Sequence, residues 1–201
     1  MATAFTEEFV VVGGTKVHTL TGGSGEPLLI LHGASGNTGW LRYVQALSEK
    51  YTIIYPTHPG FGKTSRPDWL ESVPDLAAFY TWFMEVLGLE KVRAIGFSLG
   101  GWLAAEMAAT CNHAFSKLML VGSGGIKPVE GEIADIFIIS PAQVRELLFY
   151  DPSQAPEYEE VYNRQLSPEE QLTADLNREM TVRLTWKPYM HDPRLTGLLS
   201  R

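Results

Sequence analysis

Ala94-Ile95-Gly96-Phe97-Ser98-Leu99-Gly100-Gly101-Trp102 is the stretch that decides the fold of this 201-residue chain. An apolar, β-type run meets a helical pattern here through the motif G-x-S-x-G. The turn is so tight that the positions two before and two after the serine must be nearly free of side chain, which accounts for Gly96 and Gly100. We therefore expect Ser98 on a sharp strand-to-helix turn in strained backbone geometry, with its hydroxyl above a sheet. The alternative is a simple glycine-rich turn between a strand and a helix.

A second informative stretch, residues 28–36, reads LLILHGASG, which is an apolar strand followed by small residues. Acyl transfer needs hydrogen-bond donors aimed at the oxyanion that develops during the reaction. The N–H groups of Ala34 and of Leu99, the residue after the serine, are the expected donors. Gly33 would let the loop approach a substrate closely. For His32, a structural hydrogen bond that fixes this loop is favoured over a catalytic role.

Strands and helices alternate along the chain up to residue 121. Wholly apolar runs are typical of strands buried on both faces of a parallel sheet, and helical patterns lie between them. Gly13-Gly14 separates two β-rich runs near the N-terminus and predicts a hairpin. The alternation predicts an α/β fold with a mostly parallel sheet. The expected strands are 9–12, 16–20, 28–31, 52–55, 92–96 and 118–121, and the expected helices are 40–47, 76–87 and 99–109.

The pattern changes after Gly122, because residues 124 to about 190 contain helices and loops without a convincing strand. Ser140 and Ser167 each begin a capping pattern with proline at the first helical position. We expect an inserted helical cap over the Ser98 pocket, with a separate helical domain as the alternative. The predicted organisation is a core at 1–123, a cap at 124–190 and a return toward the core at 191–201. The side chains expected to line the pocket are Ile136, Phe137, Leu147, Leu148, Phe149 and Trp186, with packing inside the cap as the alternative for half or more of them.

Together these residues resemble the α/β-hydrolase superfamily, in its branch with a serine nucleophile and a helical cap. The resemblance rests on His32-Gly33 after one strand, Pro59-Gly60-Phe61-Gly62 after the next, and the G-x-S-x-G motif around Ser98. It covers residues 8–121 and resumes at 186–199. It implies an eight-stranded, mostly parallel sheet and a catalytic triad in the chain order nucleophile, acid, histidine.

The resemblance implies a serine hydrolase that acts on a carboxylic ester or a related acyl substrate through a Ser98 acyl-enzyme. Dehalogenases and epoxide hydrolases of the superfamily carry aspartate at this position, which disfavours those two activities. Carbon–carbon hydrolysis or lyase chemistry can use the same site and stays open. A noncatalytic relative that binds a ligand or a partner is a further alternative. The expected ligand is a small acyl molecule, and neither a cofactor nor a metal is expected.

The catalytic acid and histidine have weaker candidates than the nucleophile. The resemblance implies an acid after the next strand and a histidine after the last one, and Arg201 stands where that next strand should begin. We therefore expect the last two strands to be absent and the site to be incomplete or weakly active in this chain. Glu130 is the possible acid, although a merely polar entry to the cap is the favoured interpretation of the acidic residues there. His191 is disfavoured as the base. His58 is expected at the mouth of the site and His18 on the surface.

Composition and charge exclude several classes of partner. The net charge of −7 does not favour nucleic acid or anionic lipid. No apolar run is long enough for a membrane span. The single cysteine, Cys111, cannot form an internal disulfide. A reducing compartment, the cytoplasm, is therefore expected.

The run Leu118–Val121 has a predicted role outside the active site. It is apolar at every position, with only Lys117 beside it to discourage pairing. Without further strands beside it, this run would be the edge of the sheet, with unpaired backbone groups. We expect self-association, or pairing with a C-terminal segment, through this edge.

Overall fold

A computed structural model describes residues 5–111 and 113–200 of the chain. These residues form a six-stranded sheet with the order β1-β2-β4-β3-β5-β6. The pairs β1–β2 and β2–β4 are antiparallel, whereas β4–β3, β3–β5 and β5–β6 are parallel. The predicted mixed, mostly parallel sheet is therefore present. Its strands are β1 (Phe5–Val12), β2 (Thr15–Gly23), β3 (Glu26–Leu31), β4 (Tyr51–Pro56), β5 (Val92–Phe97) and β6 (Phe115–Val121).

The N-terminal hairpin turns at the two glycines that predicted it. Gly13 and Gly14 have φ values of 54° and 84°. Two consecutive positive φ angles are what the common two-residue hairpin turn requires, and glycine adopts them without steric cost. The strands extend several residues beyond the predicted runs, because β1 and β2 pair from Phe5↔Gly22 to Val12↔Thr15.

Alternate residues of β3 enter two separate apolar clusters, one on each face of the sheet. Leu29 and Leu31 pack with residues of α2 and α3. Leu28 and Ile30 pack on the opposite face, together with Val44 of α1. This period of two places each side chain of residues 28–31 in a core, which explains the continuous apolar sequence of this stretch. The helices of the core are α1 (Arg42–Ser48), α2 (Val73–Val86) and α3 (Leu99–Thr110).

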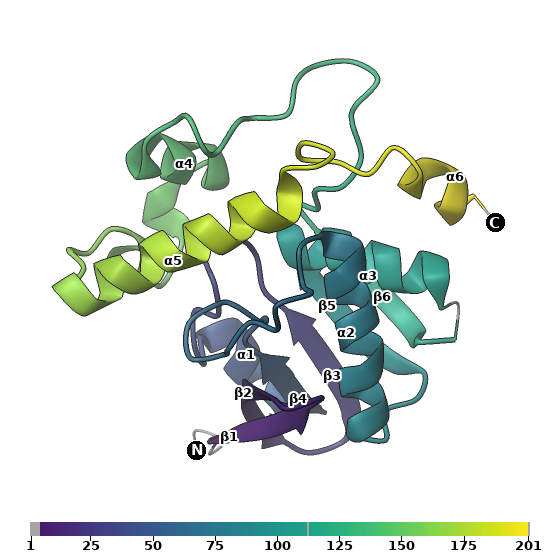
Figure 1. Ribbon diagram of the computed structural model, residues 1–201. Coiled ribbons are helices and arrows are strands. Elements are labelled where there is room, and N and C mark those ends of the chain that lie inside the picture. Colours follow the sequence, from purple (N-terminus) through teal and green to yellow (C-terminus); the bar gives the residue numbers. More distant parts are fainter. Residues whose placement is uncertain (1–4, 112, 201) are drawn as a thin grey trace.

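A helical segment lies over the carboxyl ends of the parallel strands (Figure 1). Both predicted capping boxes are present, with Ser140 capping α4 and Ser167 capping α5. Among the described residues, none of the helices combines the length and apolar character needed to cross a bilayer. The elements are α4 (Pro141–Leu148), η1 (Pro152–Gln154), η2 (Tyr158–Tyr162), α5 (Pro168–Thr185) and, after the return, α6 (Leu195–Leu199).

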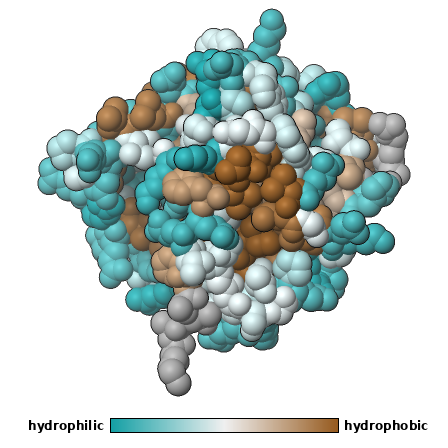
Figure 2. Space-filling model, turned by 60° about the horizontal axis from the view of Figure 1, so that its bottom comes forward, coloured by the Kyte–Doolittle hydropathy of each residue, from teal (hydrophilic) through white to brown (hydrophobic). Residues whose placement is uncertain are grey.

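Strand β6 is the edge of the sheet and differs from the other predicted apolar strands. The expectation that it would be buried on both faces is wrong, because Met119, Leu120 and Val121 are 58%, 45% and 39% exposed. The strand has a neighbour on one side only, and no described helix covers these side chains. Figure 2 shows a face of the molecule on which an apolar area lies near the middle, with smaller apolar areas toward the left and right margins.

Candidate active site

Ser98 lies at the junction of β5 and α3 in the strained geometry that the motif predicts. Its φ of 50° and ψ of −111° fall outside the regions that non-glycine residues normally adopt. The backbone is held from both sides: Ser98 N–H donates to Val121 O at 2.9 Å, and Ser98 O accepts from the N–H groups of Gly101 and Trp102 at 3.0 Å. The serine is exposed, so its hydroxyl is accessible at the carboxyl end of the sheet.

The motif glycines are required by close backbone contacts. A Cβ on Gly96 would lie 2.4 Å from Gly100 O, and a Cβ on Gly100 would lie 2.2 Å from Leu31 O. Neither contact is sterically possible, so a side chain at either position would open the turn or push α3 away from β3. A Cβ on Gly33 would lie 3.3 Å from the Cβ of Ser98. The loop after β3 therefore lies directly against the serine turn.

A cavity of about 320 Å³ opens at Ser98, and Ala34 and Leu99 also line it. Within the described part of the chain, the amides of Ala34 and Leu99 donate to no protein group. Both N–H groups are thus available to an oxyanion formed near the Ser98 hydroxyl. The other lining residues are Trp102, Ser123, Gly124, Gly125, Ile126, Pro128, Ile133, Ile136, Thr181, Thr185 and Met190.

His32 fixes the peptide that carries the Ala34 amide. Its Nδ1 donates to Gly33 O at 2.7 Å, and its Nε2 accepts from His58 N–H at 2.8 Å. Gly33 O also accepts from Gly36 N–H at 3.1 Å. In a trans peptide the carbonyl of Gly33 and the N–H of Ala34 point in opposite directions. Anchoring the carbonyl therefore aims the N–H away from His32.

The electrostatics of His32 suit this arrangement. The side chain is 1% exposed. Burial lowers the pKa of His32 to about 4, although its hydrogen bond to Gly33 acts in the opposite direction. The imidazole is therefore neutral near pH 7, with its proton on Nδ1. That tautomer is the one that can donate to Gly33 and accept from His58 at the same time.

Two other histidines lie where the sequence did not predict them. His58, expected at the mouth of the site, is fully buried and stacks on His32 with ring centroids 3.7 Å apart. Burial, followed by the neighbouring His32, lowers the pKa of His58. His18, expected on the surface, is 8% exposed and contacts Thr57 Oγ1 and Glu7 Oε2, each at 3.1 Å. Both predictions are wrong, because elements distant in the sequence cover these side chains.

The candidates for the acid and the base do not meet Ser98. Glu130 is exposed on the loop after β6 and is not part of the cavity lining. His191 Nδ1 contacts Tyr189 O at 2.8 Å, whereas the adjacent Asp192 is buried and pairs with Arg194. Within the described residues, no hydrogen bond joins Ser98 Oγ to a carboxylate or an imidazole.

The predicted lining of the cavity is largely wrong. Of the six expected side chains, Ile136 alone lines it. Phe149 packs on Tyr158 and Tyr162 instead, and Trp186 packs on Tyr189. Leu147 and Leu148 are exposed. Most of the six predicted side chains thus pack on other aromatic rings or face solvent.

A buried carboxyl cluster that the sequence analysis missed supports one wall of the cavity. Trp102 lines the cavity, and its indole N–H donates to Glu106 at 3.0 Å. Burial raises the pKa of Glu106, and the nearby Asp192 adds to this effect. Arg194 in turn lowers the pKa of Asp192. A glutamate one helical turn after a cavity-lining tryptophan was the available signal.

Helix α5 contributes a buried polar stripe that the sequence analysis also missed. Asn177, Thr181 and Thr185 are spaced by four residues, so they lie on one face of the helix. All three are buried, next to Met180 and Leu184. Thr181 and Thr185 line the cavity. This i, i+4, i+8 pattern beside apolar positions could have indicated the face that meets the core.

A family model of the α/β hydrolase fold matches residues 26–196. The chain therefore belongs to the α/β hydrolase fold family. It is 30% identical over 129 residues to a 2-hydroxy-6-oxo-6-(2'-aminophenyl)hexa-2,4-dienoic acid hydrolase of Metapseudomonas resinovorans. The matched stretch covers 61% of this chain and 44% of that protein. It is 32% identical over 109 residues to a soluble epoxide hydrolase of a Corynebacterium species, covering 54% of this chain and 38% of that protein.

Solved structures show the same fold. A membrane phospholipase A superposes with a TM-score of 0.72 at 23% identity, over 93% of this chain and 64% of that one. The chain thus spans less than half the length of the two curated relatives and about two thirds of the phospholipase chain.

Proposed function

We propose that the protein is a serine hydrolase that cleaves a carboxylic ester or a related acyl substrate through Ser98. The observation that carries this proposal is the strained, exposed serine at the opening of a cavity that two unpaired amides share with it. Strain of this kind costs free energy and persists where function or packing maintains it. The membership in a hydrolase fold family supports the same proposal.

The chemistry would proceed through an acyl-enzyme. A base removes the proton of the Ser98 hydroxyl, and Oγ attacks the carbonyl carbon of the substrate. The N–H groups of Ala34 and Leu99 stabilise the oxyanion. When the carbon–oxygen bond breaks, the departing alcohol takes up a proton. Water then attacks the acyl carbon and releases the acid, which restores the serine.

We propose that residues 124–190 act as a cap that shapes the substrate pocket. Ile126, Ile133 and Ile136 form an apolar wall, and the exposed Ser123 adds a hydroxyl. This mixture fits a small substrate with an apolar acyl chain. Changing Ile136 to a larger side chain should therefore shorten the preferred acyl chain.

A second candidate is hydrolysis of a carbon–carbon bond at the same site. The observation in its favour is the relative from Metapseudomonas resinovorans, which is named as a hydrolase of a 2-hydroxy-6-oxo-dienoic acid. A ketone of such a substrate would use the Ser98 site and the same two amides. Comparing ester substrates with a dienoic acid of this class separates the two candidates.

The test is covalent labelling of the longest natural form of the protein with a fluorophosphonate, followed by ester turnover. We expect labelling on Ser98 and turnover of short activated esters. Ser98→Ala should abolish both while leaving the melting temperature nearly unchanged. Turnover that survives in Ser98→Ala at a tenth of the original rate would disprove the role of Ser98. Specific ligand binding without labelling would favour the noncatalytic alternative.

A further inference from the structure

Asn177 joins helix α5 to two loops of the core, one of which carries the Ala34 amide of the candidate oxyanion hole. Its Nδ2 donates to Ser35 O at 3.0 Å, and its Oδ1 accepts from Gly62 N–H at 2.9 Å. The first loop follows β3 and carries Ala34, and the second follows β4. A backbone carbonyl can only accept and a backbone N–H can only donate, so these partners fix the orientation of the carboxamide.

The contact is tight and buried. Asn177 is 6% exposed. A Cβ added to Gly36 would lie 2.5 Å from Asn177 Nδ2, so the glycine makes room for the amide. Gly36 also has a φ of 96°, which favours glycine for a second reason. The loop is therefore shaped around this side chain.

Thr181, one turn further along α5, holds the neighbouring peptide. Its hydroxyl lies 3.2 Å from Ala34 O and 2.8 Å from Asn177 O, and is 2% exposed. The peptides on both sides of Ala34 are thus anchored. His32 and Gly36 donate to Gly33 O, the carbonyl that precedes the Ala34 N–H. On the other side, Thr181 donates to Ala34 O and Asn177 donates to Ser35 O.

We propose that Asn177 is a positioning residue for the oxyanion hole, with Thr181 as its assistant. The loop that carries the Ala34 amide accepts two hydrogen bonds from α5. The oxyanion hole is therefore complete only while α5 packs on the core. The proposal rests on the proposed function of Ser98. It assigns to the helical segment a role in the reaction step itself, beyond the shape of the pocket.

The test compares Asn177→Asp with a matched control, Asn163→Asp. Asn163 is exposed and its Nδ2 contacts Glu159 at 2.8 Å, so this variant makes the same chemical change away from the loop. In Asn177→Asp a carboxylate still accepts from Gly62 N–H but repels Ser35 O. We expect kcat for an activated ester to fall by roughly tenfold to a hundredfold, since loss of one oxyanion donor costs on the order of 10²–10³.

Two readouts separate positioning from a merely structural role. KM should change by much less than kcat. The rate of Asn177→Asp relative to the original protein should rise as the pH falls, because the protonated acid regains an O–H donor for Ser35. Asn163→Asp should keep the original kcat. An unchanged kcat in Asn177→Asp, or a loss confined to KM, would overturn the proposal.

Amide hydrogen exchange tests the contact without any activity. Gly36 N–H donates to Gly33 O at 3.1 Å and should exchange at least about tenfold faster in Asn177→Asp, a change that corresponds to about 1.4 kcal/mol. Gly62 N–H should keep its protection in Asn177→Asp and lose it in Asn177→Ala. If the original protein shows no Ser98-dependent turnover, the proposed function fails and this exchange alone decides the contact. Unchanged exchange at Gly36 would refute the contact whether or not Ser98 is active.

Discussion

Strand β3 and helix α5 both reach the Ser98 cavity, but different interactions hold them. Leu29, Ile30 and Leu31 of β3 are fully buried between helices on both faces of the sheet. Helix α5 has 18 residues and buries five of them: Asn177, Met180, Thr181, Leu184 and Thr185. Three of those five are polar. The strand is thus fixed by apolar burial, whereas the helix is held by a short row of contacts.

This difference separates the two halves of the candidate oxyanion hole. The Leu99 amide begins α3, whose first turn packs on the end of β3. The Ala34 amide lies in a loop that depends partly on α5. The position of the Leu99 amide is therefore fixed by the sheet, whereas the position of the Ala34 amide depends on the helical segment. We therefore expect substitutions in the two regions to differ in how large their effects are and in how far those effects extend through the molecule.

The largest effect is expected at Gly100. A methyl group there would lie 2.2 Å from Leu31 O, and this oxygen belongs to the backbone, so it cannot turn aside as a side chain could. Gly100→Ala should lower the free energy of unfolding by on the order of 4 kcal/mol or more, or prevent folding. Gly197→Ala, also in a helix but with nothing within 4 Å, should be neutral or slightly stabilising. Chemical denaturation measures both, and equal effects would contradict the packing of α3 on β3.

His32 should show the next largest effect, through the pH dependence of stability. Its pKa is about 4 in the folded protein, below the ordinary value of 6.5, so the unfolded chain binds more protons between these values. Its contribution to stability is complete above about pH 6.5 and is lost as the pH falls toward 4. The loss should approach about 3 kcal/mol, which is the pKa difference converted to free energy.

Denaturation across this pH window, with two variants, isolates the contribution of His32. His32→Gln should flatten the pH dependence, because the titrating group is gone. His113→Gln, which makes the same substitution at an exposed histidine, is the control. An identical slope in the original protein and in His32→Gln would show that His32 is not buried in its neutral form.

The sequence could predict what local contacts determine. The spacing of Gly96, Ser98 and Gly100 predicted the turn, because the close approach of the backbone leaves no other residue type. Ser140 and Ser167 predicted the starts of α4 and α5, because a capping box is complete within four residues. The hairpin followed from Gly13-Gly14 for the same reason.

What depends on distant elements could not be predicted. The burial of His58 depends on Tyr80, which donates to its Nδ1 from α2. Phe149 and Trp186 have the apolar character of pocket residues, but the folding of the segment turns them toward other aromatic rings. The spacing of Asn177, Thr181 and Thr185 could indicate a buried face of α5, but the partners of Asn177 depend on two core loops that are distant in the sequence.

Leu184 tests how firmly the apolar part of α5 holds the helix. It is 2% exposed and belongs to the same cluster as α2 and α3. Leu184→Ala should cost about 2–3 kcal/mol, whereas Leu176→Ala, at a site that is 51% exposed, should cost little. Hydrogen exchange should show the loss of protection mainly in α5, with β5 nearly unaffected. An equal loss in both would show that the helix and the sheet open as one unit.

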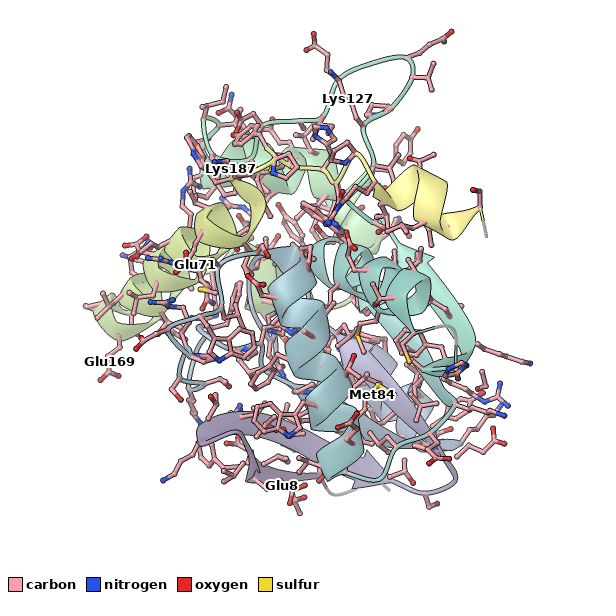
Figure 3. The ribbon with its side chains drawn as sticks, turned by 45° about the vertical axis from the view of Figure 1, so that its right-hand side comes forward. Glu8, Glu71, Met84, Lys127, Glu169 and Lys187 are labelled. Carbon is pink, nitrogen blue, oxygen red and sulfur yellow. The ribbon has the colours of Figure 1, made fainter. Side chains whose placement is uncertain are left out.

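The smallest effect is expected at Glu71, in the loop before α2. Figure 3 shows Glu71 beside α5, where its carboxylate lies 3.1 Å from Arg183; it also lies 3.3 Å from Arg66. Glu71 is 55% exposed at its side chain and Arg183 is 35% exposed, so solvent screens the pair. Glu71→Gln should lower the free energy of unfolding by less than about 1 kcal/mol. The effect should shrink further at high salt, because exposed charges are then screened more strongly. Glu146→Gln, which makes the same charge change at an exposed position on α4, is the control. A loss of several kcal/mol in Glu71→Gln, unaffected by salt, would mean that this contact, and not the buried stripe, is the main attachment of α5.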